Sequence, residues 1–64
     1  MPIVRIELFP GRSHEKKAEL AREITSTLER VADIKPEATT VLFAEVSPKE
    51  WFVAGEPFAA ATKS

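Results

Sequence analysis

The chain begins with Met1-Pro2-Ile3-Val4-Arg5-Ile6-Glu7-Leu8-Phe9, and side chains in this stretch alternate with a period of two. Val4, Ile6 and Leu8 fall on one face, while the charged Arg5 and Glu7 fall on the other. This alternation, led by β-branched residues, is typical of a strand. The Pro10-Gly11 pair that follows is a turn signal. We therefore predict a strand from Pro2 to Phe9 with one plainly apolar face.

A helix is predicted next, from Ser13 to Ala32. Ser13 is a suitable N-cap, and Glu15 brings a negative charge to the positive end of the helix dipole. Apolar residues recur at steps of three and four: Leu20, Ala21, Ile24, Leu28, Val31 and Ala32. We expect the segment Asp33-Ile34-Lys35-Pro36 to end the helix, because a proline disfavours the helical conformation of the residue before it.

A second strand is predicted from Thr39 to Val46, which is rich in apolar residues. A strand, a helix and a strand in this order form a β-α-β unit with parallel strands and a right-handed crossover. The rest of the chain predicts a turn, a short strand or hairpin near Trp51 to Ala54, and a loose end. The expected fold is thus α+β, with residues 1–64 as a single domain.

The small size of the chain points to assembly. A domain of 64 residues buries only about 60% of its unfolded surface, and there is no cysteine to form a disulfide. Parallel strands are normally covered on both faces, but one helix can cover only one. We therefore expect the outer faces, assigned here to Ile3, Phe9, Val41 and Phe43, to meet other copies of the chain.

Composition excludes several kinds of partner. The net charge is −1 and there is no basic run, which argues against nucleic acid. No apolar stretch has the length of a membrane span or a signal peptide, so we expect a soluble, cytoplasmic protein. There is no cysteine, and the lone histidine, His14, cannot build a zinc site without carboxylate partners. We expect His14 to be exposed and to have no catalytic role, and we expect no metal or other cofactor.

Pro2 is the first candidate for chemistry. If Met1 is removed, the nitrogen of Pro2 becomes a secondary amine instead of an amide. Ordinary α-amino groups have a pKa near 8, and burial or a neighbouring cation would lower it, so this nitrogen is a candidate general base. Alternatively, Pro2 only starts an edge strand, where a missing N–H does no harm.

Arg12 and Trp51 are the other two candidates. Arg12 lies just before the predicted helix N-terminus and could bind a carboxylate through paired hydrogen bonds, unless it is simply a solvated surface arginine. It lies on the order of 25 Å along the chain from Pro2, so it could serve only the Pro2 of a neighbouring subunit whose strand runs antiparallel. Trp51 is either an apolar wall of the site or a packing residue.

Taken together, these features resemble the 4-oxalocrotonate tautomerase family. They are a proline behind Met1, an alternating strand, the Gly11-Arg12-Ser13 turn before an amphipathic helix, a second strand, and an aromatic residue at Trp51 with Gly55 soon after. The resemblance implies dimers with a four-stranded sheet and hexamers that are trimers of dimers. It also implies that Pro2 is the general base that moves a proton when a 2-hydroxydienoate and its 2-oxo isomer are interconverted.

The resemblance further implies that Arg12 binds a substrate carboxylate from a neighbouring subunit and that Trp51 replaces the usual phenylalanine. Two departures are notable. The family's second functional arginine falls at Thr40, and the segment Phe52-Val53-Ala54-Gly55 is less glycine-rich than in the family. Three hypotheses remain. The chain is a tautomerase acting on small 2-oxo acids, a hydratase-type relative such as a dehalogenase or decarboxylase, or an inactive or regulatory subunit of a hetero-oligomeric tautomerase.

Overall fold

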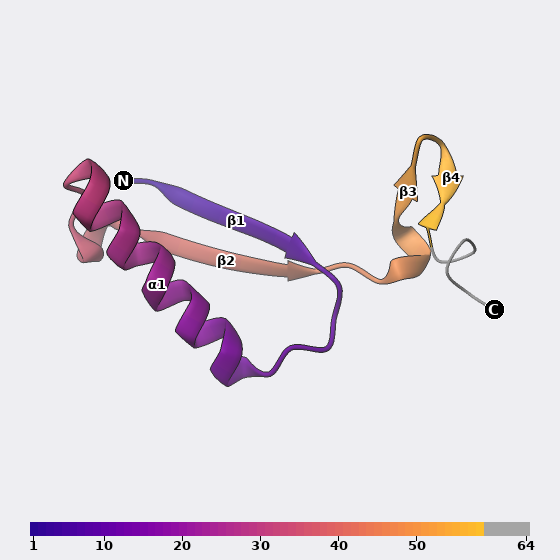
Figure 1. Ribbon diagram of the computed structural model, residues 1–64, viewed down its shortest axis with the longest axis horizontal. Helices are drawn as coiled ribbons and strands as arrows, with labels where there is room; N and C mark the ends of the chain where they lie inside the picture. The colour runs from indigo at the N-terminus through magenta and orange to yellow at the C-terminus, as the bar shows by residue number, and fades with distance from the viewer. Residues whose placement is uncertain (59–64) are drawn as a thin grey trace.

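The computed structural model describes residues 1–58 (Figure 1). The loose end predicted after the hairpin falls largely outside these residues. The elements are, in order, β1 (Ile3–Leu8), α1 (His14–Ala32), the 3₁₀ helix η1 (Pro36–Ala38), β2 (Thr40–Glu45), the 3₁₀ helix η2 (Pro48–Glu50), β3 (Phe52–Val53) and β4 (Glu56–Pro57). This order confirms the predicted β-α-β unit and C-terminal hairpin.

β1 and β2 lie side by side and run parallel, with α1 packed along one face (Figure 1). Their register places Val4 opposite Val41 and Ile6 opposite Phe43. Directly opposite residues point to the same face of a sheet, and these four side chains are half-buried. An ion pair from Lys17 of α1 to Glu45 of β2 marks this face as the one that the helix covers.

The register corrects the expected composition of the open face. Val41 and Phe43 were expected there, but they share the helix side with Val4 and Ile6. Leu42, which is 44% exposed, lies on the open face instead, in the company of Ile3, which is 65% exposed. The sequence did not reveal this because the four consecutive residues of β2 from 41 to 44 are all apolar, so its two faces look alike.

The helix begins as predicted. The Ser13 hydroxyl oxygen accepts a hydrogen bond from the Lys16 N–H at 3.1 Å, which satisfies one of the free donors of the first turn. The helix ends at Asp33, which adopts a left-handed conformation with φ of 59°. The N–H groups of Asp33 and Ile34 then donate to the carbonyls of Glu29 and Leu28 at 3.0 and 3.3 Å. Termination therefore occurs three residues before Pro36.

The C-terminal hairpin stands beyond the carboxyl ends of β1 and β2, away from α1 (Figure 1). Its two-residue loop is Ala54-Gly55, with φ values of 55° and 79°. Two successive positive φ angles are characteristic of the turns whose twist matches that of antiparallel strands. At the base of the hairpin, the Phe58 N–H donates to the Trp51 carbonyl at 2.8 Å.

No side chain among residues 1–58 is fully buried in the single copy. Large apolar side chains are instead exposed in every part of the fold, including Val31 on α1 and Phe52 and Val53 on the hairpin. Within residues 1–58 of one copy, therefore, only one face of the two-stranded sheet is covered and there is no enclosed core. This is the structural basis for expecting other copies to cover the rest.

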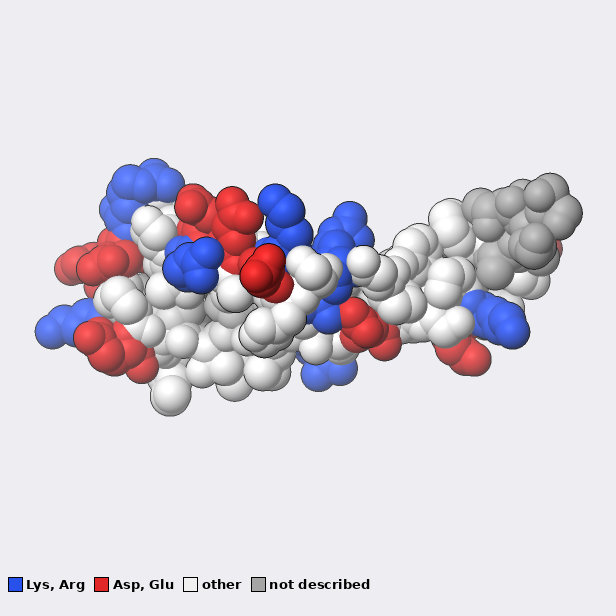
Figure 2. Space-filling view, turned by 90° about the horizontal axis from the view of Figure 1, so that it is seen from below, with Lys and Arg blue, Asp and Glu red and all other residues white. Residues whose placement is uncertain are grey.

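Charges are mixed over the surface. On the face shown in Figure 2, Lys and Arg side chains are interspersed with Asp and Glu and form no continuous patch of one sign. None of the helices in residues 1–58 is long and apolar enough to cross a membrane.

Candidate functional site

The candidate residues fall into two groups at opposite ends of the β1–β2 sheet. Pro2 and Thr40 lie where the two strands begin, whereas Arg12 and Trp51 come after the strands have ended. Six residues of β1 separate the groups, at about 3.3 Å per residue. Within one copy, Arg12 and Trp51 are therefore too far away to act on a molecule bound at Pro2.

The structure joins Pro2 directly to Thr40. The Thr40 N–H donates to the Pro2 carbonyl at 3.1 Å, adding one more rung before the first residue of β1. Pro2 is half-buried, while Met1 before it is 91% exposed and lies outside the strand. The main chain of Pro2 is thus fixed to the sheet on its carbonyl side, and removal of Met1 would cost no packing.

Thr40 pairs with Ile3 in the register of the sheet, so both side chains lie on the open face. The Thr40 side chain is half-buried. It carries a hydroxyl, which can make neutral hydrogen bonds but cannot supply a positive charge. Thr39, one residue earlier, directs its hydroxyl to the Lys35 carbonyl at 3.3 Å and so caps the preceding turn.

Arg12 is exposed in the turn that leads from β1 into α1. Gly11 before it has φ of 129°, a conformation that side-chain-bearing residues rarely adopt, so the turn depends on this glycine. Arg12 lines an open groove of about 450 Å³ together with side chains of the first helical turns: Lys16, Glu19, Leu20 and Glu23.

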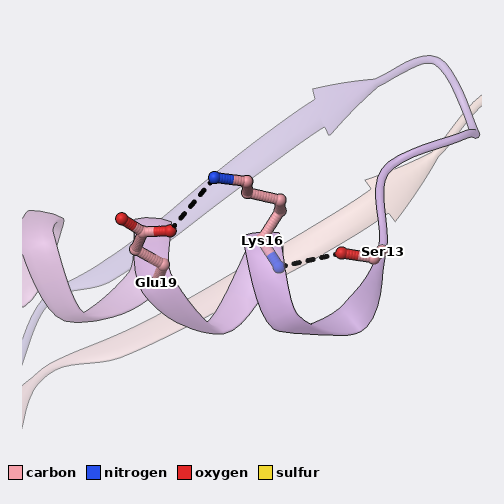
Figure 3. A network of polar contacts seen from close by, with 3 residues as sticks. All are labelled: Ser13, Lys16 and Glu19. Carbon is pink, nitrogen blue, oxygen red and sulfur yellow. Dashed lines mark hydrogen bonds and ion pairs between the residues drawn. The ribbon is translucent and has the colours of Figure 1, made fainter.

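The polar contacts beside Arg12 are local to the helix. Lys16 donates its backbone N–H to Ser13, and its ammonium lies 3.4 Å from a carboxylate oxygen of Glu19 (Figure 3). Both charged side chains are largely exposed, and exposed pairs contribute little to stability. This arrangement holds the start of α1 and leaves the Arg12 guanidinium exposed beside it.

Trp51 belongs to an aromatic cluster at the end of β1. Its ring meets that of Phe9 edge to face, with centroids 4.5 Å apart, and the Phe58 ring lies 5.3 Å from Phe9. The Trp51 indole Nε1 is buried and has no acceptor among the described residues. Trp51 therefore packs within its own copy and also lines an open groove of about 220 Å³ with Glu7, Val46, Glu50 and Phe52.

Phe9 has a contact that the sequence analysis did not anticipate. It was assigned to an outer face, and its ring packs against Trp51 of its own chain. Forty-two positions separate the two residues, so no local pattern connects them. A third groove, beside α1 and η1, contains no candidate residue. His14, the first residue of α1, is exposed, as expected.

Comparison with known proteins gives a consistent result. Residues 2–61 match the model of the family described as "Tautomerase enzyme". The chain is 45% identical over 56 residues to a "Probable tautomerase" of Streptococcus thermophilus, covering 88% of this chain and 92% of that protein. A "Probable tautomerase" of Streptococcus mutans is 43% identical, with the same coverage of both chains.

Solved structures agree with these relatives. TomN, described as a 4-oxalocrotonate tautomerase homologue in the tomaymycin biosynthetic pathway, is 32% identical, with a TM-score of 0.88 over 98% of this chain and 97% of its own. A heterohexamer 4-oxalocrotonate tautomerase from Chloroflexus aurantiacus is 36% identical, with a TM-score of 0.81 over 92% of this chain and 95% of that one.

Proposed function

The chain belongs to the tautomerase family, and on this premise we propose that it is a tautomerase that moves a proton within small 2-hydroxydienoate or 2-oxo acids. The Pro2 amine is the general base after Met1 has been removed. It accepts a proton from the enol form of the substrate and returns it to a carbon of the same molecule, so no oxidant or reductant is consumed. Residues 1–64 then form one tautomerase-like domain.

The observation that carries this proposal is the position of Pro2. Its carbonyl is fixed by the Thr40 N–H at 3.1 Å, so its ring is held at the start of β1 while its nitrogen takes no part in the sheet. A base that acts on a small substrate must be held within hydrogen-bonding reach of the proton it removes. The hydrogen bond to the Pro2 carbonyl holds the ring in place and leaves the Pro2 nitrogen free to accept a proton.

The other three residues have supporting roles. The Arg12 guanidinium binds the substrate carboxylate through charge-assisted hydrogen bonds, and Trp51 forms an apolar wall. Thr40 contributes only a hydroxyl at the position of the family's second arginine. Because Arg12 and Trp51 lie at the opposite end of the sheet from Pro2, a complete site takes these two residues from a neighbouring copy. The working form is therefore an oligomer, proposed to be a homo-hexamer.

The test uses two forms of the natural chain, one with Met1 removed and one with Met1 retained, identified by intact mass. With Met1 present, the Pro2 nitrogen is a tertiary amide and has essentially no basicity. We expect turnover of a 2-hydroxydienoate by the first form only. Pro2→Ala keeps a terminal amine but makes it primary, so this variant tests whether the secondary amine of the proline ring is needed. We expect it to lower kcat. Equal activity in fully Met1-retaining protein would exclude Pro2 as the base.

A second candidate is favoured by one specific relative. The similar protein from Chloroflexus aurantiacus is described as a heterohexamer, and Thr40 leaves this chain without the second arginine. In this alternative, the chain is a subunit that takes the missing cation from a different polypeptide. Purification from its natural source would then yield an equimolar partner, and the pure chain would be inactive towards an enol substrate.

A further inference from the structure

We propose that Arg5 supplies positive charge to the 2-oxo end of the substrate, in place of the second arginine that the resemblance puts at Thr40, and that Glu7 weakens this charge. The inference rests on the proposed function, because it assigns a further substrate-binding residue to the same site. It adds the cation that contacts the C2 oxygen as enolate charge develops and the carboxylate that limits it.

The register of the sheet places Arg5 on the same face as Thr40. Thr40 lies opposite Ile3, and Arg5 is two residues further along β1, opposite Leu42. Residues two apart in a strand point to the same face, so Arg5 and Thr40 both lie on the open face. A diagonal pair of this kind is separated by about 7–8 Å, which a long side chain can span.

Arg5 is the one Lys or Arg within the strands of residues 1–58. Two other cations near the ends of the sheet, Lys35 and Lys49, have no position in the register. Lys35 precedes η1, where its carbonyl accepts from the Thr39 hydroxyl at 3.3 Å, and Lys49 belongs to η2, beyond the end of β2. A substrate that reaches the Thr40 hydroxyl therefore meets Arg5 as the cation of the same sheet face.

The Arg5 side chain is turned toward Glu7, away from Thr40. Its Nε lies 3.2 Å from a Glu7 carboxylate oxygen, and the two side chains are 62% and 56% exposed. Ion pairs as exposed as this one contribute little to stability, so Arg5 can leave Glu7 for a substrate anion at low cost. Until it does, the Glu7 carboxylate offsets part of its positive charge.

This arrangement gives the site a positive group that is weaker than the family's arginine. A guanidinium beside the C2 oxygen stabilises the charge that develops on it. Arg5 starts one residue pair further along the sheet than Thr40 and has Glu7 as a competing partner, so it should stabilise that charge less well. The natural chain should therefore turn over a dicarboxylate dienol slowly, and this residual turnover should depend on Arg5.

The first experiment changes each member of the ion pair. Arg5→Met keeps an unbranched apolar side chain without the charge and should lower kcat/KM for the dicarboxylate dienol about tenfold, whereas Arg5→Lys should retain part of it. Glu7→Gln removes the competing charge and should raise kcat/KM about two- to fivefold. A gain of this kind cannot come from lost folding or assembly, which sedimentation checks for every variant.

Lys35→Met and Lys49→Met are the matched controls, because each removes one positive charge from a position outside the sheet. Both should have the kcat/KM of the natural chain. No loss in Arg5→Met, or an equal loss in a control, would overturn the proposal.

The second experiment asks whether Arg5 and the position of Thr40 serve the same end of the substrate. In a chain that carries Thr40→Arg, the substrate has a closer cation and should no longer depend on Arg5. Adding Arg5→Met to that chain should therefore lower kcat/KM less than about threefold, because the two changes affect one interaction and are not additive. A loss as large as in the natural chain would mean that Arg5 acts elsewhere and would overturn the proposal.

Ligand binding separates this inference from the proposed function. Calorimetry measures the Kd of 2-oxohexanedioate, a saturated dicarboxylate with a 2-oxo group, and this Kd should rise about tenfold in Arg5→Met but not in Lys35→Met. If the natural chain turns over the dienol and Arg5→Met matches it in both kcat/KM and Kd, the inference fails and the proposed function stands. If Kd rises in Arg5→Met alone but the natural chain turns over no enol substrate, the assignment of Arg5 stands and the proposed function fails.

Discussion

Arg12 combines an exposed side chain with a fixed backbone, because Gly11, with its positive φ, sets the turn in which Arg12 lies. In the proposed site its guanidinium makes charge-assisted hydrogen bonds to the substrate carboxylate. Such bonds are worth about 1.5–3 kcal/mol, so Arg12→Ala should lower kcat/KM on a 2-oxo acid roughly 10- to 150-fold. Circular dichroism should show an unchanged fold, since Arg12 makes no hydrogen bond to another described residue.

The matched control for that loss is Arg22→Ala, which removes the same charge from an exposed position on α1. Its kcat/KM should equal that of the natural chain. If both variants lost activity, the loss would reflect net charge. If neither lost activity, the Arg12 guanidinium would have no role in turnover. In either case Arg12 would be an ordinary surface arginine.

In the proposed site, Thr40 is the residue that sets the preferred substrate. Its hydroxyl would stand at the position that the resemblance gives to a second arginine, so the substrate's 2-oxo end would lack a positive group at that position as enolate charge develops. One such donor is commonly worth about 3–4 kcal/mol. We expect the natural chain to prefer a monocarboxylate 2-hydroxyalkenoate with an apolar end to a dicarboxylate dienol, and Thr40→Arg to raise kcat/KM for the dicarboxylate.

Thr39→Arg is the control for this gain. It adds the same charge one residue earlier, in extended backbone that directs the side chain to the opposite side, and it should not improve turnover of the dicarboxylate. Efficient turnover of the dicarboxylate by the natural chain would mean that another cation performs the role of the absent arginine.

At the scale of elements, the sequence was informative where a local pattern determines the structure. The period of two in β1, the Ser13 cap and the apolar spacing of α1 predicted those elements to within a residue at each end. The faces of β2 could not be assigned, because Leu42 and Phe43 are both apolar and only the register with β1 distinguishes them. The Phe9–Trp51 contact was missed for a similar reason, since it depends on where two distant segments meet.

The Ser13 cap also supports a prediction about stability. Its oxygen accepts the Lys16 N–H at 3.1 Å, and loss of an N-cap side chain typically costs about 1 kcal/mol. Ser13→Ala should therefore lower the free energy of unfolding by about that amount. Ser26→Ala makes the same substitution at an exposed position within α1, where the higher helix propensity of alanine should leave stability equal or slightly raised. The free energies of unfolding of the two variants are measured by urea titration at one protein concentration. Equal losses in the two variants would show that the Ser13 cap contributes nothing.

At the scale of the whole molecule, residues 1–58 of one copy lack the enclosed apolar core that a stable domain needs. None of residues 1–58 is fully buried, one face of the β1–β2 sheet is open, and the hairpin carries Phe52 and Val53 at 60% and 58% exposure. The apolar surface that other copies would cover is thus a large part of what drives folding. Folding and association should then be coupled, and stability should depend on protein concentration.

The last prediction is that folding and association are coupled. On serial dilution, sedimentation should show the oligomer dissociating, and far-UV circular dichroism should lose helix signal over the same concentration range. The thermal midpoint should fall with each dilution, because mass action favours the unfolded single chain. A chain that sediments as a monomer at micromolar concentration, retains its helix signal and melts at a temperature independent of concentration would contradict the prediction, and with it the argument that other copies cover the open face.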